Sequence, residues 1–405
     1  MSARRLFYPA LAAISAIALV SLYLLAARGD GIPPPSLGVG RAKASRPKLA
    51  DDIRNNTLGF EKIFVVGLPS RTDRRDGIVL EAALSNLDVE FVDGVRGGDV
   101  PDKAVPTGPG RERLPDPVVG CWRAHMNAMQ EVVRRNLSSA LIMEDDADWD
   151  VRLRSQLHDF ALASHALTQP LAGSSPASLR YADATFPDPT DGPSAVPDLA
   201  FDTLPATAPP TASPYGDHWD VLWLGHCGMR FPFAGGNGSQ AAPVPRGRVV
   251  HAPDATVPQH RHLWTMASPD DLRAQYGHHT RVVHHAQDGV CTLAYAVTRR
   301  GARKLLRELG LEALGAPLDI ELRRFCETPP RGGRRIRSCL TAQPSLFGIH
   351  LPAGPKKSNS DISDHGAGYQ AAMTRGVRYS VRMNADVLIE GRMNELVDQW
   401  PDAGQ

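Results

Sequence analysis

The sequence predicts an α/β fold with a ligand site at the carboxyl ends of its strands. Short apolar runs, including Lys62–Leu68 and Ala140–Met143, have the composition of buried strands, and Val89–Val92 is predicted to be a short second strand. Between them, Val118–Asn136 carries apolar residues three and four positions apart, as an amphipathic helix does. Ligands of open α/β sheets bind beyond the carboxyl ends of the strands. The strand at Ala140–Met143 ends in a cluster of carboxylates: Glu144, Asp145, Asp146, Asp148 and Asp150.

This acidic strand end is suited to a hard divalent cation. Carboxylate oxygens are the ligands that such ions prefer, and a bound ion can in turn hold a diphosphate. The alternative is a solvated loop or a helix N-terminus, where acidic residues are favoured in any case. The direct junction with a buried strand favours metal binding.

A basic turn follows the first predicted strand and contains Arg71, Arg74 and Arg75. The start of a helix already favours anions, and arginine can bind a phosphate through two parallel hydrogen bonds. The alternative is a solvated helix start in which Asp73 and Asp76 neutralise the arginines. The charge pattern alone leaves both interpretations open.

Other candidate catalytic or metal-binding side chains lie elsewhere along the chain. Asp319 and Glu321 stand in a partly apolar run, which can raise a carboxyl pKa toward base function. They could equally be acids in the first turn of a helix. His125 lies near the apolar stripe of a predicted helix, where a histidine is more often structural. The pairs 278–279 and 284–285 are interpreted as structural, because neighbouring histidines on a strand point to opposite faces.

Composition excludes some classes of protein. The chain has 405 residues and a formal net charge of +1, which gives no support to nucleic-acid binding. Its five cysteines form no CxxC pair, so a zinc site is not expected, and the odd number leaves at least one thiol unpaired. Cys326 and Cys339 flank a loop rich in Pro, Gly and Arg and are the first candidates for a disulfide.

The N-terminus predicts a secretory-pathway protein. The uncharged run Leu6–Ala27 is long enough to cross a hydrocarbon core of ~30 Å as a helix. Arg4 and Arg5 before it favour a cytoplasmic N-terminus. A cleaved signal peptide is the alternative, but its apolar region would be unusually long. Either interpretation places the rest of the chain in the lumen, where three sequons, at Asn55, Asn136 and Asn237, could carry glycans.

Two segments have the composition of linkers. Residues 28–58, after the predicted anchor, contain Pro33–Pro35 and several glycines and are expected to form a stem. Residues 166–216 form a low-complexity insertion, in which Pro170–Ser213 is rich in Pro, Ala, Ser, Thr and Asp. Such a composition is not expected to bury enough apolar surface to order itself. We therefore expect this insertion to be disordered or loosely packed.

Seven segments in the same order give the chain a resemblance to a known family. The segments are LPSRTDRR (68–75), GCWRAH (120–125), ALIMEDD (140–146), WDVLWLGHCG (219–228), AYAVTRRGARKLL (294–306), PLDIEL (317–322) and QPSLFG (343–348). Together they resemble glycosyltransferase family 25, which includes lipopolysaccharide and collagen galactosyltransferases. The order of the segments and the position of the insertion resemble the fungal membrane-anchored branch most.

The resemblance implies a GT-A-like, Rossmann-type nucleotide-sugar-binding domain that acts with inversion. It implies a donor that is commonly UDP-galactose and a metal ion, Mn²⁺ or Mg²⁺. Arg71, Arg74, Arg75 and Asp145 match positions near the donor, and Glu144, Asp146 and Asp148 match the DxD-like metal motif. Two registers of that motif exist, Glu144-x-Asp146 and Asp146-x-Asp148, and Asp146 serves in both. Asp319 is the candidate base, with Glu321 and His226 as reserves.

The resemblance also implies a division of the chain. Residues 1–27 would be the cytoplasmic tip and anchor, 59–165 the nucleotide-sugar-binding part, and 217–360 the acceptor-side part, with 361–405 as a C-terminal segment. The predicted protein is a Golgi, single-pass type II membrane glycoprotein that transfers a hexose to a glycan, lipid or protein acceptor.

Two other functions stay open at this point. A non-catalytic lumenal protein could keep the same fold and bind nucleotide sugars or glycans. A metal-dependent phosphohydrolase is less favoured, because the sequence has no second clear motif of metal-binding carboxylates or histidines.

Overall fold

A computed structural model describes residues 49–108, 112–190, 192–233, 244–328, 337–363 and 365–402. The predicted anchor, Leu6–Ala27, most of the predicted stem and the sequon at Asn237 lie outside these ranges. Within them, no helix is both long and apolar enough to span a bilayer. The sequons at Asn55 and Asn136 lie in the described part of the chain, and both asparagines are exposed.

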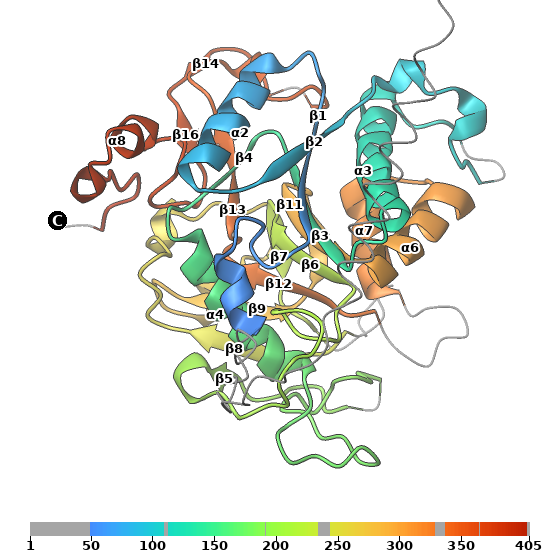
Figure 1. Cartoon of the computed structure of the whole chain (residues 1–405), viewed down its shortest axis with the longest axis vertical. Helices are drawn as coiled ribbons and strands as arrows, with labels where there is room; N and C mark the ends of the chain where they lie inside the picture. Colours follow the sequence, from blue (N-terminus) through green and yellow to red (C-terminus); the bar gives the residue numbers. More distant parts are fainter. Residues whose placement is uncertain are drawn as a thin grey trace, which may run out of the picture. The chain divides into compact units, whose positions relative to one another are not determined.

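The fold is α/β and is built on a nine-stranded mixed sheet (Figure 1). In spatial order its strands are β2 (Val89–Asp93), β1 (Lys62–Gly67), β3 (Ser139–Glu144), β11 (Ala294–Thr298), β6 (Val221–Gly225), β12 (Cys339–Gln343), β9 (Arg281–His285), β8 (Arg248–His251) and β5 (Leu199–Ala200). β1 runs parallel to β2 and β3, whereas β11 runs antiparallel to both β3 and β6. The α/β class and the predicted strands at Lys62, Val89 and Ala140 are confirmed.

Helices cover both faces of this sheet. Along β1, Ile63 and Val65 face one apolar core and Phe64 and Val66 face the other, because side chains alternate across a strand. The first core is completed by α2 (Thr72–Leu84) and α4 (Leu153–Thr168). The second is completed by α3 (Asp116–Arg134), α6 (Arg299–Arg307) and α7 (Leu318–Glu327), which gather on the right of Figure 1. The central parallel strands β1 and β3 are therefore buried on both sides, as their apolar sequences predict.

A small three-stranded sheet stands beside the main one. It consists of β16 (Met373–Thr374), β13 (Phe347–Leu351) and β4 (Ala147–Trp149). β4 begins three residues after β3 ends, so the chain changes sheets within the acidic segment. The remaining short elements are β7 (Gly228–Arg230), β10 (Gln287–Val290), β14 (Gly354–Pro355), β15 (Tyr369–Gln370), α5 (Asp271–Gln275) and α8 (Ala385–Ile389).

Two disulfides link loops around the sheet. Cys326 is bonded to Cys339, which confirms the pairing predicted from the sequence. Cys227, just after β6, is bonded to Cys291, just before β11. Cys121 on α3 keeps a free thiol.

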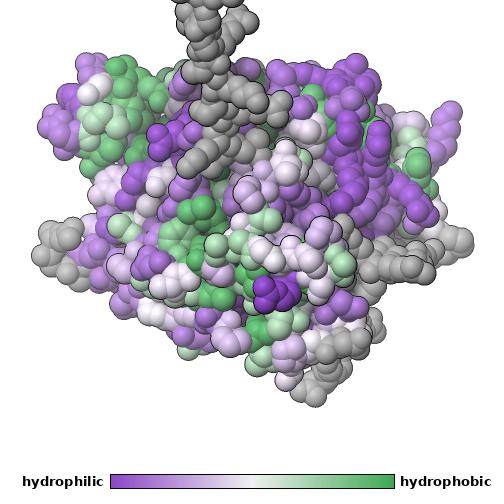
Figure 2. Space-filling model, turned by 60° about the horizontal axis from the view of Figure 1, so that its bottom comes forward, coloured by the Kyte–Doolittle hydropathy of each residue, from purple (hydrophilic) through white to green (hydrophobic). Residues whose placement is uncertain are grey.

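The insertion at 166–216 is ordered in nearly all of its length, so the prediction of disorder was wrong. Its strand β5 joins the edge of the main sheet. Buried Asp183 accepts hydrogen bonds from Thr185 and from the backbone of Gly247. Arg246 donates to three backbone carbonyls of the insertion, those of Pro189, Gly192 and Pro193. Figure 2 brings the bottom of Figure 1 forward and shows apolar side chains gathered among hydrophilic ones on that face.

The composition argument failed because it counted only the apolar surface that the insertion could bury by itself. Buried hydrogen bonds between the insertion and the rest of the chain also stabilise it. Each of them contributes about 1 kcal/mol to the free energy of unfolding.

Candidate active site

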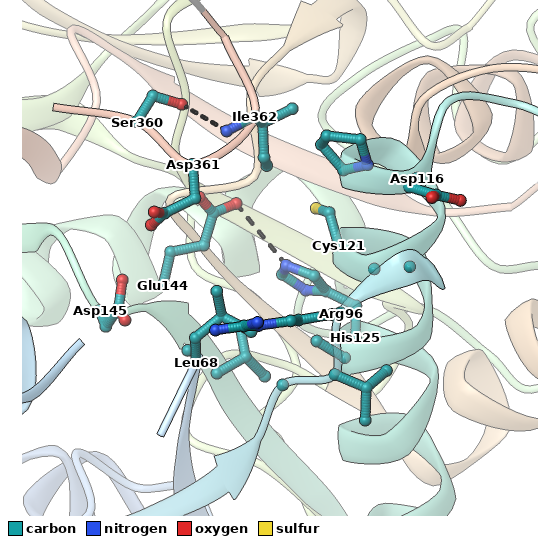
Figure 3. A pocket seen from close by; sticks show the side chains of 18 of the residues that line it. Leu68, Arg96, Asp116, Cys121, His125, Glu144, Asp145, Ser360, Asp361 and Ile362 are labelled. Atoms are coloured by element: carbon teal, nitrogen blue, oxygen red, sulfur yellow. Dashed lines mark hydrogen bonds and ion pairs between the residues drawn. The ribbon is translucent and has the colours of Figure 1, made fainter. Parts of the chain in front are cut away.

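A cavity of about 460 Å³ lies beyond the carboxyl ends of β1, β2 and β3 (Figure 3). The strand ends, the loop at 94–99, one face of α3 and the segment 360–362 form its walls. This is where an open α/β sheet binds its ligands, and the volume suits a small molecule. The acidic strand end predicted from the sequence therefore borders the main cavity among the described residues.

Glu144, Asp145 and Asp146 form the acidic wall of the cavity. Arg74 of α2 reaches this wall, with its Nη1 atom 2.7 Å from Asp145 Oδ1 and 3.2 Å from Asp146 Oδ2. Burial raises the pKa of Asp146 to about 7, in spite of the nearby Arg74 charge, and the neighbouring carboxylates add to this rise. Burial also raises the pKa of Asp145. One arginine thus compensates only part of the negative charge that two buried carboxylates bring together.

Asp146 has room for a further ligand. Its Oδ1 atom is buried and has no hydrogen-bond partner among the described residues. A buried polar atom without a partner is unusual and calls for an unseen ligand, water or ion. Among the residues that the structure describes, no group of three or more His, Cys, Asp or Glu side chains lies close enough to hold a metal ion. A metal here would therefore need oxygens from a bound ligand in addition to the carboxylates.

Glu144 is held by two neighbours at the side of the cavity. Thr292 donates a hydrogen bond of 2.7 Å to Glu144 Oε1, and His125 Nε2 lies 3.6 Å from the same oxygen. His125 Nδ1 is 2.9 Å from the Tyr295 hydroxyl. Burial opposes ionisation of Glu144, but the contacts with His125 and Thr292 outweigh it, so its pKa is lowered. Figure 3 shows His125 pointing from α3 toward Glu144.

His125 and Cys121 occupy the same face of α3, one turn apart. Both line the cavity, and burial together with nearby carboxylates raises the pKa of the Cys121 thiol. At neutral pH this thiol is protonated, and only a thiolate is a strong nucleophile or metal ligand. Cys121 is therefore a wall residue of the cavity.

Only one of the three predicted arginines lines the cavity. Arg71 pairs with Asp73 at 2.8 Å and with Asp361, and Arg75 pairs with Asp93. These pairings agree with the interpretation of a helix start whose charges are neutralised locally. Arg74 was predicted to lie near the donor, and in the structure it lines the cavity.

Asp148 lies apart from the other acidic residues, because it is on β4. Its carboxylate accepts hydrogen bonds from Thr374 and Ser380 and from the backbone of Trp149 and Arg382. These four donors satisfy a fully buried side chain. The structure thus does not bring Asp148 to the predicted metal site, and only the register Glu144-x-Asp146 places both carboxylates at the cavity.

Asp319 and Glu321 also lie outside the lining of the cavity. Asp319 accepts hydrogen bonds from the backbone N–H groups of Cys291 at 2.9 Å and Ile320 at 2.8 Å. Glu321 accepts from the backbone of Gly315 and from Arg324. Both residues stand in the first turn of α7, which was the alternative interpretation of this run. Neither is placed as a base in the cavity.

Some cavity residues escaped the sequence analysis. The loop at 94–99 packs so closely against α3 that a Cβ atom on Gly120 would lie 2.7 Å from the Val95 carbonyl oxygen. A Cβ atom on Gly67 would lie 2.0 Å from Asp145 Oδ2. The glycines in these segments could have indicated these cavity walls, since glycine permits close approach of the backbone to neighbours and ligands. The wall at 360–362 comes from a distant segment and carried no local signal.

Comparisons with known proteins match the part of the chain that carries most of this cavity. Residues 60–172 match the sequence profile of Glycosyltransferase family 25 (LPS biosynthesis protein). The chain is 30% identical over 128 residues to the human protein "Inactive glycosyltransferase 25 family member 3", an alignment covering 29% of this chain and 22% of that protein. It is 30% identical over 122 residues to "Procollagen galactosyltransferase 1-B" of Xenopus laevis, covering 26% and 20%. With human "Procollagen galactosyltransferase 2" the identity is 29% over 116 residues, covering 25% and 18%.

The chain thus matches about a fifth of the length of these relatives. The matched part contains β1 to β3, α2, α3 and all of the cavity wall except 360–362. The resemblance predicted from the ordered motifs is confirmed for this part, since residues 60–172 match the profile of glycosyltransferase family 25 and the relatives found carry that family's name or its galactosyltransferase activity in theirs.

Proposed function

We propose that the protein is a metal-dependent inverting glycosyltransferase that moves a hexose, galactose from UDP-galactose, onto a glycan, lipid or protein acceptor. One observation carries the proposal. The acidic wall and Arg74 meet at the carboxyl ends of parallel strands, and one buried oxygen of Asp146 is left without a partner. A nucleotide sugar needs this combination of a cavity with charges at one end.

The cavity offers two kinds of surface. Val66, Leu68 and the glycine-rich loop at 94–98 provide apolar and backbone surface suited to a flat base and its ribose. Glu144, Asp145, Asp146 and Arg74 provide the charged surface. We place the nucleoside against the first surface and the diphosphate against the second.

The donor set fits Mn²⁺ or Mg²⁺. Glu144 and Asp146 would hold the ion through hard carboxylate oxygens, which suit these metals. When bound, such an ion acts as a Lewis acid on the diphosphate leaving group. Arg74 orients Asp145 and Asp146 through its two contacts and offers a positive charge to the diphosphate.

Inversion also needs a base that takes the proton of the acceptor hydroxyl. Asp319 and Glu321 could serve only by releasing their backbone N–H partners. Glu144 connects the cavity wall to the β11 side of the sheet, because its N–H is bonded to the Leu293 carbonyl before β11. We therefore place the acceptor on the Glu144 side of the cavity.

The test is Mn²⁺-dependent turnover of a panel of nucleotide sugars by the full chain, before and after Asp146→Asn. We expect UDP-galactose to be turned over by the parent and the variant to lose this activity while its melting temperature is kept. Asp88→Asn is the matched control, because Asp88 is exposed and distant from the cavity wall. Full activity of Asp146→Asn would refute the assignment.

A second candidate function is nucleotide-sugar binding without catalysis. It is favoured by the engagement of Asp319 and Glu321 with backbone groups and by matched relatives whose names call them inactive. Calorimetry with UDP and Mn²⁺, run beside the turnover assay, separates the two functions. Binding without turnover of any donor would support this second candidate.

We also propose that the protein acts in the lumen of the secretory pathway, in the Golgi, behind a single-pass type II anchor at Leu6–Ala27. The support is the composition of that run together with two exposed sequons at Asn55 and Asn136. An endoglycosidase that shortens the protein on a gel would agree with this location. A protein that carries no glycan when both sequons are intact would speak against it.

A further inference from the structure

A second, smaller cavity of about 50 Å³ lies at the same edge of the sheet as the first. It is found beyond the carboxyl ends of β6 and β12, next to the start of β11. Leu293 lines this cavity, and its carbonyl oxygen accepts a 2.9 Å hydrogen bond from the N–H of Glu144, which lines the first. The two cavities are therefore neighbours, and Figure 1 shows β3, β11 and β6 side by side between them.

Arg375 supplies a positive charge to this cavity, and Asp270, which also lines it, has its carboxylate paired with Arg273 at 3.1 Å. Its guanidinium carbon lies 4.0 Å from the centre of the Trp264 ring, and its side chain makes no hydrogen bond or ion pair with any described residue. By contrast, nearby Arg378 pairs with Asp398, and Arg281 pairs with Asp254 at 2.7 Å. Burial lowers the pKa of Arg375, and no carboxylate opposes the effect. A half-buried arginine in this state is a ready partner for an anion.

Trp264 supplies an apolar surface beside that charge. The residue lines the cavity and is 43% exposed, which is unusual for the largest apolar side chain. Arg375 covers one face of its ring, and this stacking holds the guanidinium with its N–H groups free. The ring also offers surface for the C–H groups of a flat molecule such as a pyranose.

His226 supplies a buried hydrogen-bond acceptor. It lies in the loop after β6 and is 9% exposed. Its Nε2 atom is 2.9 Å from the Ala342 carbonyl oxygen, so Nε2 carries the proton and Nδ1 has the lone pair. Nδ1 is buried without a partner among the described residues. Burial lowers the pKa of His226 to about 4, so the ring is neutral at physiological pH and can accept a hydrogen bond from a hydroxyl.

We propose that this second cavity is an acceptor subsite for an anionic saccharide. The carboxylate or phosphate group of the sugar binds Arg375, the sugar ring lies against Trp264, and a hydroxyl donates to His226 Nδ1. The cavity is too small to enclose a hexose, so only the anionic substituent and the hydroxyl next to it enter the cavity, and the ring stays at the rim. This inference rests on the proposed transferase function, because it assigns the acceptor to the side of Glu144 away from the nucleotide.

The three contacts select among saccharides. A neutral sugar would leave Arg375 without an acceptor, whereas an anion can take up two of its N–H groups. A peptide acid has the charge but lacks a pyranose ring for Trp264. Donation to His226 requires a hydroxyl close to the anionic group, as in a uronic acid or a sugar phosphate.

The experiment is calorimetric titration of the full chain, with and without UDP and Mn²⁺, using three probes. The probes are methyl β-D-glucuronide, glucose 6-phosphate and methyl β-D-glucoside, which separate carboxylate, phosphate and neutral sugars. We expect at least one anionic probe to bind. The affinity of the neutral glucoside should be lower by a factor of about ten or more, since hydrogen bonds to charged groups are stronger than those between neutral groups. The stronger of the two anionic probes identifies the source of the charge.

Variants test the role of each residue. Arg375→Gln should weaken the anionic probe about tenfold or more and leave UDP binding unchanged. Arg375→Lys keeps the positive charge but lacks the planar guanidinium group. Its affinity for the anionic probe should lie between those of the parent and of Arg375→Gln. Arg303→Gln is the control, because Arg303 is an exposed arginine on α6. Trp264→Ala removes the ring and should weaken all three probes.

The outcomes distinguish this inference from the proposed function. If UDP and Mn²⁺ bind but neither anionic probe binds, the subsite is refuted and the transferase proposal stands. Equal binding of glucuronide and glucoside, with no effect of Arg375→Gln, refutes the anionic specificity. If the anionic probes bind in an Arg375-dependent way but UDP does not bind, the site is upheld and the transferase proposal fails. Melting curves of each variant confirm that it is folded in every case.

Discussion

Arg74 on α2 and Asp145 at the end of β3 form a 2.7 Å ion pair across the mouth of the candidate active site. Both side chains are largely buried, and Arg74 Nη2 also donates to the Asn359 carbonyl oxygen. The pair thus connects the first strand-to-helix turn, the acidic strand end and the segment that precedes the wall at 360–362. It joins three parts of the chain that the sequence keeps far apart.

Removal of the Arg74 charge should cost both stability and activity. Arg74→Gln leaves Asp145 and Asp146 facing each other without compensation, and breaking a buried pair from one side costs about 3–5 kcal/mol. Chemical denaturation measures this loss, and Mn²⁺-dependent turnover measures the loss of activity. The double variant Arg74→Gln/Asp145→Asn should recover much of the stability and none of the activity. If the single variant is as stable as the parent, the ion pair does not hold the site together.

The position of Arg74 shows where sequence reasoning succeeded. The strands β1, β2 and β3 and the helix α3 were predicted because local patterns determine them: apolar runs for the strands and helical spacing for α3. Since parallel strands bring their carboxyl ends together, the sequence placed the acidic residues at the ligand-binding edge before any contact was known.

Asp148 and Arg71 show why the rest could not be predicted. Asp148 is satisfied by Thr374 and Ser380, which lie 226 and 232 positions away along the chain. Arg71 is paired with Asp361, 290 positions away. Such distant partners cannot be inferred from the local sequence. The sequence alone therefore does not distinguish a buried structural carboxylate from a metal ligand. The same applies to the wall at 360–362, which closes the cavity from a segment assigned to the C-terminal region.

Buried histidines should make the protein less stable in mild acid. Burial lowers the pKa of His284 to about 3 and the pKa of His285 to about 4, whereas unfolded histidine titrates near 6.5. The unfolded chain therefore takes up protons first, and stability is full above about pH 6.5 and falls as the pH drops toward 4. Each such histidine contributes up to about 1.4 kcal/mol per pH unit to the slope. The free energy of unfolding, measured between pH 7.5 and 4.5, checks this.

A single substitution tests how much His285 contributes to the pH dependence of the free energy of unfolding. Both ring nitrogens of His285 are buried without a hydrogen-bond partner among the described residues. His285→Leu should flatten the pH dependence without loss of stability at neutral pH. His158→Gln is the control, because His158 is exposed and should leave the slope unchanged. An unchanged slope in His285→Leu would contradict the assignment.

The two disulfides should differ in their contribution to stability. Cys227–Cys291 spans 64 residues and Cys326–Cys339 spans 13, and the loss of unfolded-state entropy grows with the length of the closed loop. The chain-entropy relation gives about 4 kcal/mol for the longer loop and about 3 kcal/mol for the shorter one. Paired Cys→Ser variants, compared by urea denaturation at neutral pH, measure both values. An equal or reversed order would show that native contacts, rather than loop length, determine the difference.

Asp319→Asn decides whether this residue supports the fold or acts as the base. Its carboxylate holds the N–H of Cys291, and that cysteine anchors the loop between the two cavities through its disulfide. A structural role predicts a lower melting temperature with nearly unchanged hydrolysis of the nucleotide sugar, since asparagine has one acceptor oxygen where the carboxylate uses two for these N–H groups. A base role predicts the opposite: an unchanged melting temperature, donor hydrolysis that persists, and transfer to the acceptor that falls by about 100-fold or more. The geometry favours the first result, because Asp319 lies outside the cavity lining and both of its oxygens are already engaged.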